Sequence, residues 1–274
     1  REAWSPARRQ GAGVATILLL VTASLLLGYA IEAIIPRGLA GNIALGLLAS
    51  TLIAQKSLYQ HVARVRSAFE TGGLKAAREA VSLIVGRDPN SLDENGVSRA
   101  AIESCAENFS DGVVAPTFWL ALLGLPGLIA YKTINTADSM IGHRSDRYRD
   151  FGRASARLDD LVNLAPARIA GLLLALAAPL ARGSIASALK TMGRDARRHR
   201  SPNAGWPESA MAGALNIKLA GPRRYAEGLV DDPYLNADGC EAAPSDIGRA
   251  LRMLVVACGI EFAIYAILTW FIVL

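Results

Sequence analysis

Three carboxylates stand four residues apart in the stretch ESCAENFSDGVVAP, at Glu103, Glu107 and Asp111. On a helix they would share one face with Asn108, and like charges at this spacing cost roughly 0.2–0.5 kcal/mol per pair. The face therefore calls for a partner such as a metal ion, an arginine cluster or a cationic ligand. Mg²⁺ is usually held by one or two carboxylates together with substrate phosphates. We predict Glu107, Asn108 and Asp111 as metal ligands because they lie nearest the following apolar run, with Glu103 in support; a solvated helix face is the alternative.

A second polar stripe lies in NTADSMIGHR, where Asn135, Asp138 and Ser139 follow helical spacing. Asp138 is a candidate base or metal ligand. Lys132 and Arg144 flank the stripe and are candidates for contacts with anionic groups, as is Asn135. The alternative is a polar helix end that leaves a bilayer.

Arginines four residues apart form a third feature, with Arg153 and Arg157 as its best candidates. A guanidinium offers a planar fork that suits phosphate or carboxylate. A salt-bridged surface helix is the alternative, because Asp146 and Asp150 are within reach in the sequence. Asp159 and Asp160 precede another apolar segment and are therefore the stronger acidic candidates.

A fourth feature is the stretch DARRHRSPNAGWPE, in which basic residues run into a turn rich in Pro and Gly. Pro207 suits the first turn of a helix through Ala214, and places Glu208 in that turn. Asn203 and Glu208 are the candidates here; the helix start would attract anions, which Glu208 would oppose unless it binds a metal or an amine, and a plain surface loop is the alternative. The sequence contains no GxxxxGK[ST], GxGxxG, HExxH or CxxC motif.

Long apolar segments must position these residues. Residues 11–35, 38–55 and 253–274 are long enough to cross a hydrocarbon core, which takes about 20 residues. The segment 113–131 is interrupted by Pro and Gly, which predicts a broken helix or re-entrant hairpin covered by protein. The segment 169–181 is short for a span and is expected to dip into the membrane.

The polar segments 61–112, 136–160 and 184–250 are rich in Lys and Arg, which favours the cytoplasmic side for all three. Simple crossings at both doubtful apolar segments would instead place 136–160 outside. The polar segments are predicted to be helical, with a break at Gly72 and Gly73 and a capping box at Ser91–Glu94. The sequence thus predicts one all-α, polytopic membrane domain over residues 1–274.

The composition sets limits on partners. Of 274 residues, 52% are hydrophobic and 19% are charged, with 29 Lys and Arg against 24 Asp and Glu. This modest basic excess suits anionic small molecules or lipid head groups, and no nucleic-acid module is present. Three cysteines without metal-ligand spacing make a disulfide framework unexpected. Because the chain begins at Arg1, we expect it to be part of a longer protein.

Five stretches together resemble the adenosylcobinamide-phosphate synthase, or cobinamide synthase, family of cobalamin biosynthesis. In family order they read IVGRD, ESCAENFSDGVVAP, YKTINTADSMIGHR, ARLDDLVNLAPARI and SPNAGWPESAMAGAL. The resemblance covers most of the chain from about His61 onward. The family usually begins with another apolar segment and a stretch with Asp-Pro and His-Pro, which this chain lacks.

The resemblance implies a multi-pass protein of the inner membrane with a cytoplasmic active face. It also implies a reaction that joins aminopropanol, or its O-phosphate, to the free propionate of adenosylcobyric acid as an amide, with ATP and Mg²⁺. Asp138, Asp160 and Glu208 would then accept a proton, and Lys132, Asn135, Arg144, Arg153, Arg157 and Asn203 would bind the substrates. Membrane lipid and other late enzymes of the pathway are the expected partners. A membrane scaffold or sensor and a small-molecule transporter are the alternatives.

Overall fold

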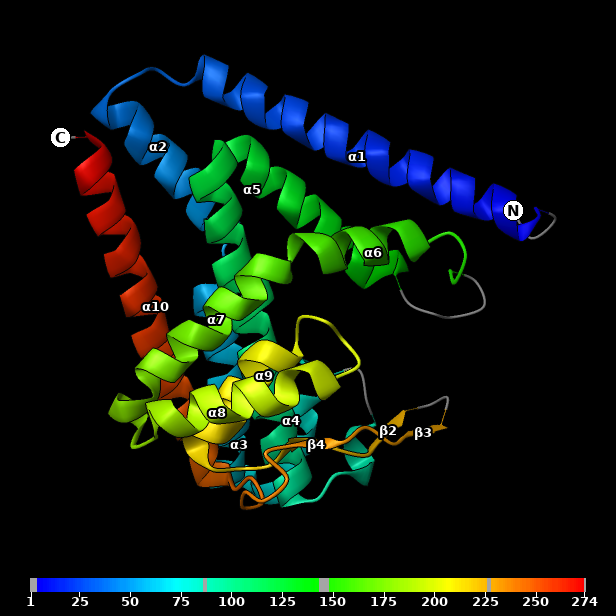
Figure 1. Ribbon diagram of the computed structural model, residues 1–274, viewed down its shortest axis with the longest axis vertical. Coiled ribbons are helices and arrows are strands. Elements are labelled where there is room, and N and C mark those ends of the chain that lie inside the picture. The colour runs from blue at the N-terminus through cyan, green and yellow to red at the C-terminus, as the bar shows by residue number, and fades with distance from the viewer. Residues whose placement is uncertain (1–3, 86–87, 143–147, 226–227, 274) are drawn as a thin grey trace. The chain divides into compact units, whose positions relative to one another are not determined.

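The computed structural model describes residues 4–85, 88–142, 148–225 and 228–273 (Figure 1). Contacts divide the chain into two compact units, residues 1–54 with 115–166 and residues 55–114 with 167–274. The single domain expected from the sequence stays a prediction.

The fold is all-α, and its apolar helices confirm the predicted polytopic membrane class. Within the described residues, five helical stretches are long and apolar enough to cross a membrane: Pro6–Ile34, Leu39–Val81, Glu94–Ile141, Leu164–Ala181 and Pro244–Phe271. The stretch Leu164–Ala181 contains the segment that we expected only to dip into the bilayer. Its length and composition also permit a crossing, so the number of crossings stays a prediction.

The first unit contains α1 (Pro6–Ile34), α2 (Leu39–Ser50), α5 (Ala115–Ile141) and α6 (Arg153–Val162). Helix α5 packs against α1, α2 and α6, and α1 also packs against α6. A small apolar core joins α2 and α5 through Ala49, Leu125 and Leu128. In this unit, α5 is the helix to which the other three are attached.

The break predicted within the apolar segment 113–131 is confirmed at Gly124, where α5 turns with φ 68° and ψ −159° (Figure 1). Glycine adopts a positive φ without the steric cost that other residues incur. Glu32 of α1 accepts a hydrogen bond from the Leu125 backbone amide at 2.8 Å, and so caps the second half of α5. Pro126 follows, where a missing amide hydrogen costs little because a new helical segment is starting.

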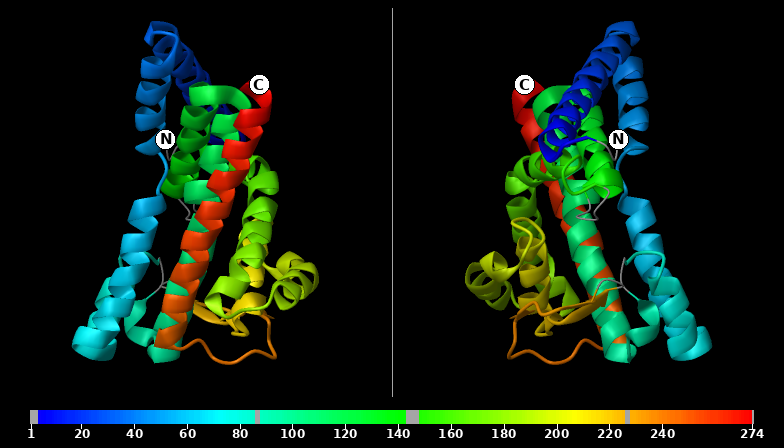
Figure 2. Two further views of the ribbon diagram at one scale, coloured as in Figure 1. Left: turned by 90° about the vertical axis from the view of Figure 1, so that its left-hand side faces the viewer. Right: turned by 90° about the vertical axis from the view of Figure 1, so that its right-hand side faces the viewer.

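The second unit begins with α3 (Gln55–Val81), η1 (Pro89–Ser91), α4 (Glu94–Phe109) and a π-helical turn, η2 (Ser110–Val114). It continues with α7 (Leu164–Ala177) from Ala167 onward, η3 (Ala178–Ala181), α8 (Ile185–Asp195), η4 (Ala196–Arg198), α9 (Gly205–Leu215) and α10 (Pro244–Val273). Helix α10 runs beside α3 and α4, and α9 packs between α8 and α4 (Figure 2). The predicted break in α3 is found at Gly73.

Two small antiparallel sheets connect α9 to α10. One pairs β1 (Leu219–Ala220) with β4 (Tyr234–Leu235), and the other pairs β2 (Arg223–Tyr225) with β3 (Gly228–Val230). The sequence did not indicate these strands because each has only two or three residues, too few for an alternating pattern to show. The sheet of β1 and β4 packs against α4 and α9, and so folds the polar segment after α9 back against these helices.

Candidate functional site

In the first unit, Asp159 of α6 is the centre of a polar network with α5. Asn163 donates its side-chain amide to Asp159 Oδ2 at 3.0 Å, and Asn135 of α5 donates to Asp159 Oδ1 at 3.4 Å. The buried Tyr131 hydroxyl lies 2.9 Å from Asn163 Oδ1, where it donates a hydrogen bond. This bond fixes which end of the Asn163 amide faces Asp159. Each carboxylate oxygen therefore receives one amide hydrogen.

Close packing at the start of α6 brings this network together. A Cβ atom at Gly152, which precedes α6, would overlap the carbonyl oxygen of Ile141 at the end of α5. Only glycine allows this approach, and it sets α6 directly against the last turns of α5. Asp138 lies in those turns, close enough for its charge to act on Asp159.

Burial, followed by the charge of Asp138, raises the pKa of Asp159 to about 6. The hydrogen bonds from Asn135 and Asn163 work in the opposite direction, and the charge of Asp160 adds a smaller increase. A carboxyl group with a pKa close to neutrality exchanges its proton under physiological conditions, as a general acid or base must.

The other predicted site residues of this unit differ in exposure, partly buried on α5 and exposed on α6. Lys132, Asn135 and Asp138 are partly buried on α5. Arg153, Arg157 and Asp160 are exposed on α6, on the side away from Asp159. The structure thus separates the two neighbouring aspartates, and it is Asp159 that joins Asn135. Arg144 lies outside the described residues.

In the second unit, the acidic face formed by Glu103, Glu107, Asn108 and Asp111 is only partly exposed. Glu103 is buried, and its Oε1 accepts the backbone amide of Ala220 of β1 at 2.7 Å, with Arg99 Nε 3.9 Å from the same oxygen. Glu103 thus ties α4 to β1. Glu107 and Asn108 are exposed, and Asp111 is partly buried within the π-helical turn.

The donor set on this face suits a hard cation. Asn108 donates its amide nitrogen to the Ser104 carbonyl at 2.9 Å, which turns its side-chain oxygen the other way. Two carboxylates and an amide oxygen are donors that Mg²⁺ accepts when water and phosphate complete its shell. Among the described residues, no group of three or more His, Cys, Asp or Glu side chains is placed to hold a metal by itself.

The SPNAGWPE turn buries two of its polar side chains, Asn203 and Glu208. Glu208 lies in the first turn of α9, as predicted, and its Oε2 is 3.8 Å from Nε2 of the buried His199. The Ser201 backbone amide donates to His199 Nδ1 at 3.1 Å, so the ring proton is on Nε2 and faces Glu208. The plain surface loop that we considered therefore does not describe this turn.

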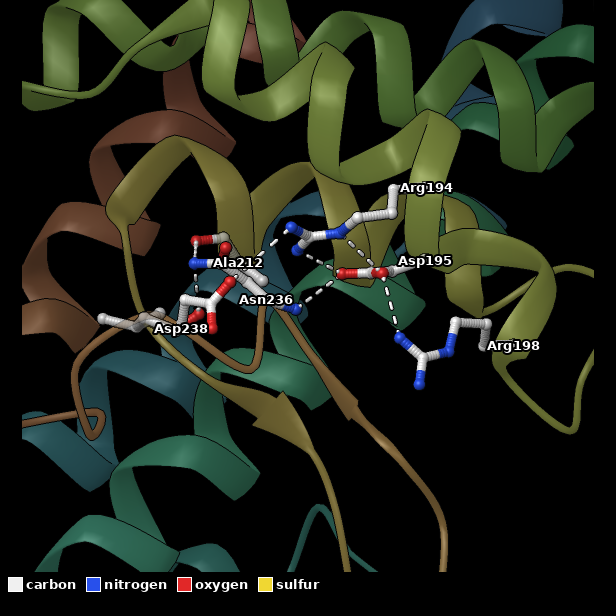
Figure 3. Close-up of polar contacts among 7 residues, drawn as sticks. Arg194, Asp195, Arg198, Ala212, Asn236 and Asp238 are labelled. Atoms are coloured by element: carbon white, nitrogen blue, oxygen red, sulfur yellow. Dashed lines mark hydrogen bonds and ion pairs between the residues drawn. The ribbon is translucent and has the colours of Figure 1, made fainter.

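A buried aspartate organises the neighbouring basic stretch (Figure 3). Arg194 binds both oxygens of Asp195, at 2.9 and 2.7 Å, and Arg198 reaches Oδ1 at 3.4 Å. The Asn236 backbone amide donates to Oδ2 at 2.9 Å. Burial opposes the charged form, but the hydrogen bonds from Arg194, Asn236 and Arg198 outweigh it and lower the pKa of Asp195.

Comparison with known proteins places this chain in a family. The family described as CobD/Cbib protein matches residues 1–254. The chain is 52% identical to the cobalamin biosynthesis protein CobD of Rhodobacter capsulatus over 241 residues, 88% of this chain and 76% of the relative. It is 58% identical to that of Brucella melitensis over 236 residues, with 85% and 72% covered. With the protein of Sinorhizobium fredii it shares 54% over 260 residues, with 93% and 80% covered.

The chain belongs to the CobD/Cbib family. This confirms the resemblance drawn from the five sequence stretches and assigns the chain to cobalamin biosynthesis. No solved structure matches the chain.

Sequence reasoning underrated two polar residues of this family member. Asp159 and Asp160 were both considered and Asp160 was chosen as a proton acceptor, but adjacent aspartates in a sequence do not reveal which one faces inward. The weak signal was that Asp159 lies four residues before Asn163, a spacing that puts both on one helical face. His199 was passed over because a single histidine in a basic stretch has no spacing pattern of its own.

Proposed function

We propose that this member of the CobD/Cbib family forms an amide bond in cobalamin biosynthesis. The amine of aminopropanol, or of its O-phosphate, would join the free propionate carboxylate of adenosylcobyric acid, giving adenosylcobinamide or its phosphate. The observation that carries the proposal is the family match over residues 1–254, which includes the Asp159 network of the first unit and the acidic face of the second. The reaction would consume ATP with Mg²⁺.

The proposed reaction makes three demands. A carboxylate and an ammonium do not condense in water, so the carboxylate needs activation, for which phosphoryl transfer from ATP is the natural route. Phosphate charge must be screened, and Mg²⁺ bound through Glu107, Asn108 and Asp111 would supply that screening. The ammonium must also lose a proton before its nitrogen can attack a carbonyl carbon.

The remaining predicted residues answer the binding and proton demands. Lys132, Arg153 and Arg157 carry positive charge for the corrinoid carboxylate, the nucleotide or the amino alcohol phosphate. Asn135 and Asn203 contribute amide groups for orientation, and Arg144 is a further cation. Asp138, Asp160 and Glu208 are the proton acceptors inferred from the sequence. General-base assistance of this kind is worth about 10²- to 10⁴-fold in rate.

The chain's apolar helices are compatible with a multi-pass membrane protein. We place the protein in the inner membrane with its active face toward the cytoplasm, where ATP is present. Membrane lipid and other late enzymes of the pathway would be its partners there.

The test is an assay of purified protein in lipid nanodiscs with adenosylcobyric acid carrying ¹⁸O in its free carboxylate. We expect an amide product that forms only with ATP and Mg²⁺, and one ¹⁸O atom in the inorganic phosphate released. Amide formation without nucleotide consumption, or no amide with any amine offered, would contradict the proposal.

Two substitutions test the metal face. Glu107→Gln and Asp111→Asn should each raise the Mg²⁺ concentration needed for half-maximal rate at least tenfold. Glu94→Gln changes an exposed carboxylate at the other end of the same helix and should leave that concentration unchanged.

A transporter is the second candidate class, and its sequence features are Glu32 and Glu261, because acidic residues within spans often mark transport paths. In this protein Glu32 accepts the Leu125 amide at the break in α5, which is a structural role. This disfavours transport. A non-catalytic scaffold or sensor would not consume ATP in the assay above.

A further inference from the structure

Two adjacent aspartates in LDDLV offer the same chemistry, and the structure distinguishes them. Asp160 is exposed beside Arg153 and Arg157, whereas Asp159 is partly buried against α5. We infer that Asp159, held by Asn135 and Asn163, is the carboxylate that takes the proton from the substrate ammonium. This inference rests on the proposed amide-forming function, and it names a residue that the sequence alone did not select.

Preorganisation of the carboxylate is the first argument. Both of its oxygens receive a side-chain amide hydrogen, at 3.0 and 3.4 Å, and the Tyr131–Asn163 hydrogen bond of 2.9 Å holds one of those amides in place. Asn163 donates from the same helical turn, and Asn135 donates from α5. A base fixed from two helices keeps its position while substrates enter.

The charges around Asp159 supply the second argument. Asp138 faces it from α5, and Asp160 lies beside it on α6. Helix α1 also packs on α6, and its Arg9 pairs with Asp150 at 3.4 Å. Burial and the negative charge of Asp138 favour the protonated form, and hold the pKa of Asp159 at about 6. Such a carboxylate is ionised at neutral pH yet binds a proton more strongly than an ordinary one.

The proposed step is a single proton transfer. One N–H bond of the ammonium breaks, its electron pair stays on nitrogen, and an O–H bond forms on Asp159. The neutral amine then attacks the carboxyl carbon activated by phosphate from ATP, and phosphate leaves with the electrons of the C–O bond. The nitrogen loses its second proton to water, and Asp159 releases its own proton before the next turnover.

The experiment compares rates of amide formation from pH 5 to 9 in the wild type, Asp159→Asn and Asp160→Asn. We expect the wild-type rate to fall below about pH 6 as Asp159 becomes protonated. Asp159→Asn should lower the rate by about 10²- to 10⁴-fold and abolish this acid limb. Asp150→Asn is the control in the same unit, since that carboxylate pairs with Arg9, and it should keep both rate and limb.

Two further measurements separate a proton acceptor from a structural residue. An aminooxy analogue of the amine is unprotonated at neutral pH, so the defect of Asp159→Asn should shrink at least tenfold with this substrate. Asn135→Ala removes a hydrogen bond that lowers the pKa of Asp159, and should move the acid limb to higher pH. This second variant keeps the test decisive if Asp159→Asn fails to fold.

The outcomes are distinct. If wild type forms no amide, the proposed function fails. If wild type is active and Asp159→Asn keeps its rate and acid limb, or if Asp160→Asn alone loses them, the inference about Asp159 is overturned while the function stands.

Discussion

Asp159 and Asp195 are two buried or partly buried aspartates, one in each unit, and their surroundings differ in the charge of the donors. Burial, and then the charge of Asp138, raise the pKa of Asp159 to about 6, and the neutral amides of Asn135 and Asn163 offset only part of this rise. Asp195 receives two guanidinium groups and a backbone amide, and its pKa is lowered. Burial has the same sign in both cases. The identity of the partners therefore decides whether a carboxylate can exchange a proton or is held as a permanent anion.

This difference also separates their roles. Asp195 anchors Asn236, which has a φ of 54° and donates its side-chain amide to Ala212 and Ile217 (Figure 3). It thereby ties the segment after β4 to α8 and α9. In the part of the chain that the structure describes, the hydrogen bonds to the Asp159 carboxylate come from the side chains of Asn135 and Asn163, and they hold the carboxylate itself.

The largest expected effect on stability follows from replacing Asp195, the aspartate with the structural role. Asp195→Ala would leave the Asn236 amide and two guanidinium groups without their acceptor, and should reduce the free energy of unfolding by about 3 kcal/mol. Thermal unfolding in detergent would show this as a lower Tm. Asp238 lies 3.9 Å from Arg194 but is 95% exposed, so Asp238→Ala should leave the Tm unchanged. Equal effects from the two substitutions would show that burial of Asp195 is not what matters.

The second prediction concerns pH, and the two aspartates should act with opposite sign. The folded protein binds the Asp159 proton more tightly than the unfolded chain, whose carboxyl has a pKa near 3.8. Its stabilising contribution is thus fully present below pH 4 and is lost as pH rises through about 6, by at most about 3 kcal/mol. Asp195 contributes stability above its unfolded pKa and loses it as the solution becomes more acidic.

Unfolding measured at several pH values in each variant checks these signs. Asp159→Asn should remove the loss of stability between pH 4 and 7, whereas Asp195→Asn should remove part of the loss below pH 4. If Asp159→Asn left the slope between pH 4 and 7 unchanged, Asp159 would not titrate in that range.

The smallest expected effect tests how the Asp159 network is held. Tyr131→Phe deletes the hydroxyl that orients Asn163 and should cost about 1 kcal/mol of unfolding free energy. Tyr29→Phe in the same unit is the control, because Tyr29 is 59% exposed and its loss should be negligible. A Tyr131→Phe protein as stable as wild type would mean that Asn163 keeps its orientation through Asp159 alone.

Several structural features were correctly predicted from local residue patterns. The breaks at Gly73 and Gly124 follow from glycine in otherwise helical runs, and Pro207 marks the first turn of α9. The capping box at Ser91–Glu94 was wrong. Asp93 is the N-cap, and its side chain accepts the Gly96 amide at 2.7 Å, because Asp caps as well as Ser and the helix starts at Glu94.

The candidate site was predicted as positions in the sequence more than as neighbours in space. Asp138 and Asn135 were selected, and both lie at Asp159. The choice between Asp159 and Asp160 needed the helix to be placed, since a rotation of about 100° per residue separates their side chains. The roles of Glu107, Asn108, Asp111 and Glu208 stay predictions.

The sequence by itself determined the family, the all-α class and the apolar stretches, because these depend on composition, periodicity and motifs along the chain. Tertiary structure decided which carboxylates meet amides, arginines or backbone. Glu103 binds Ala220, Glu32 caps the break in α5, and Asp159 joins Asn135 although each pair is distant in sequence. The strength of a carboxylic acid depends on its nearest charges and hydrogen-bond donors, and only folding brings those groups together.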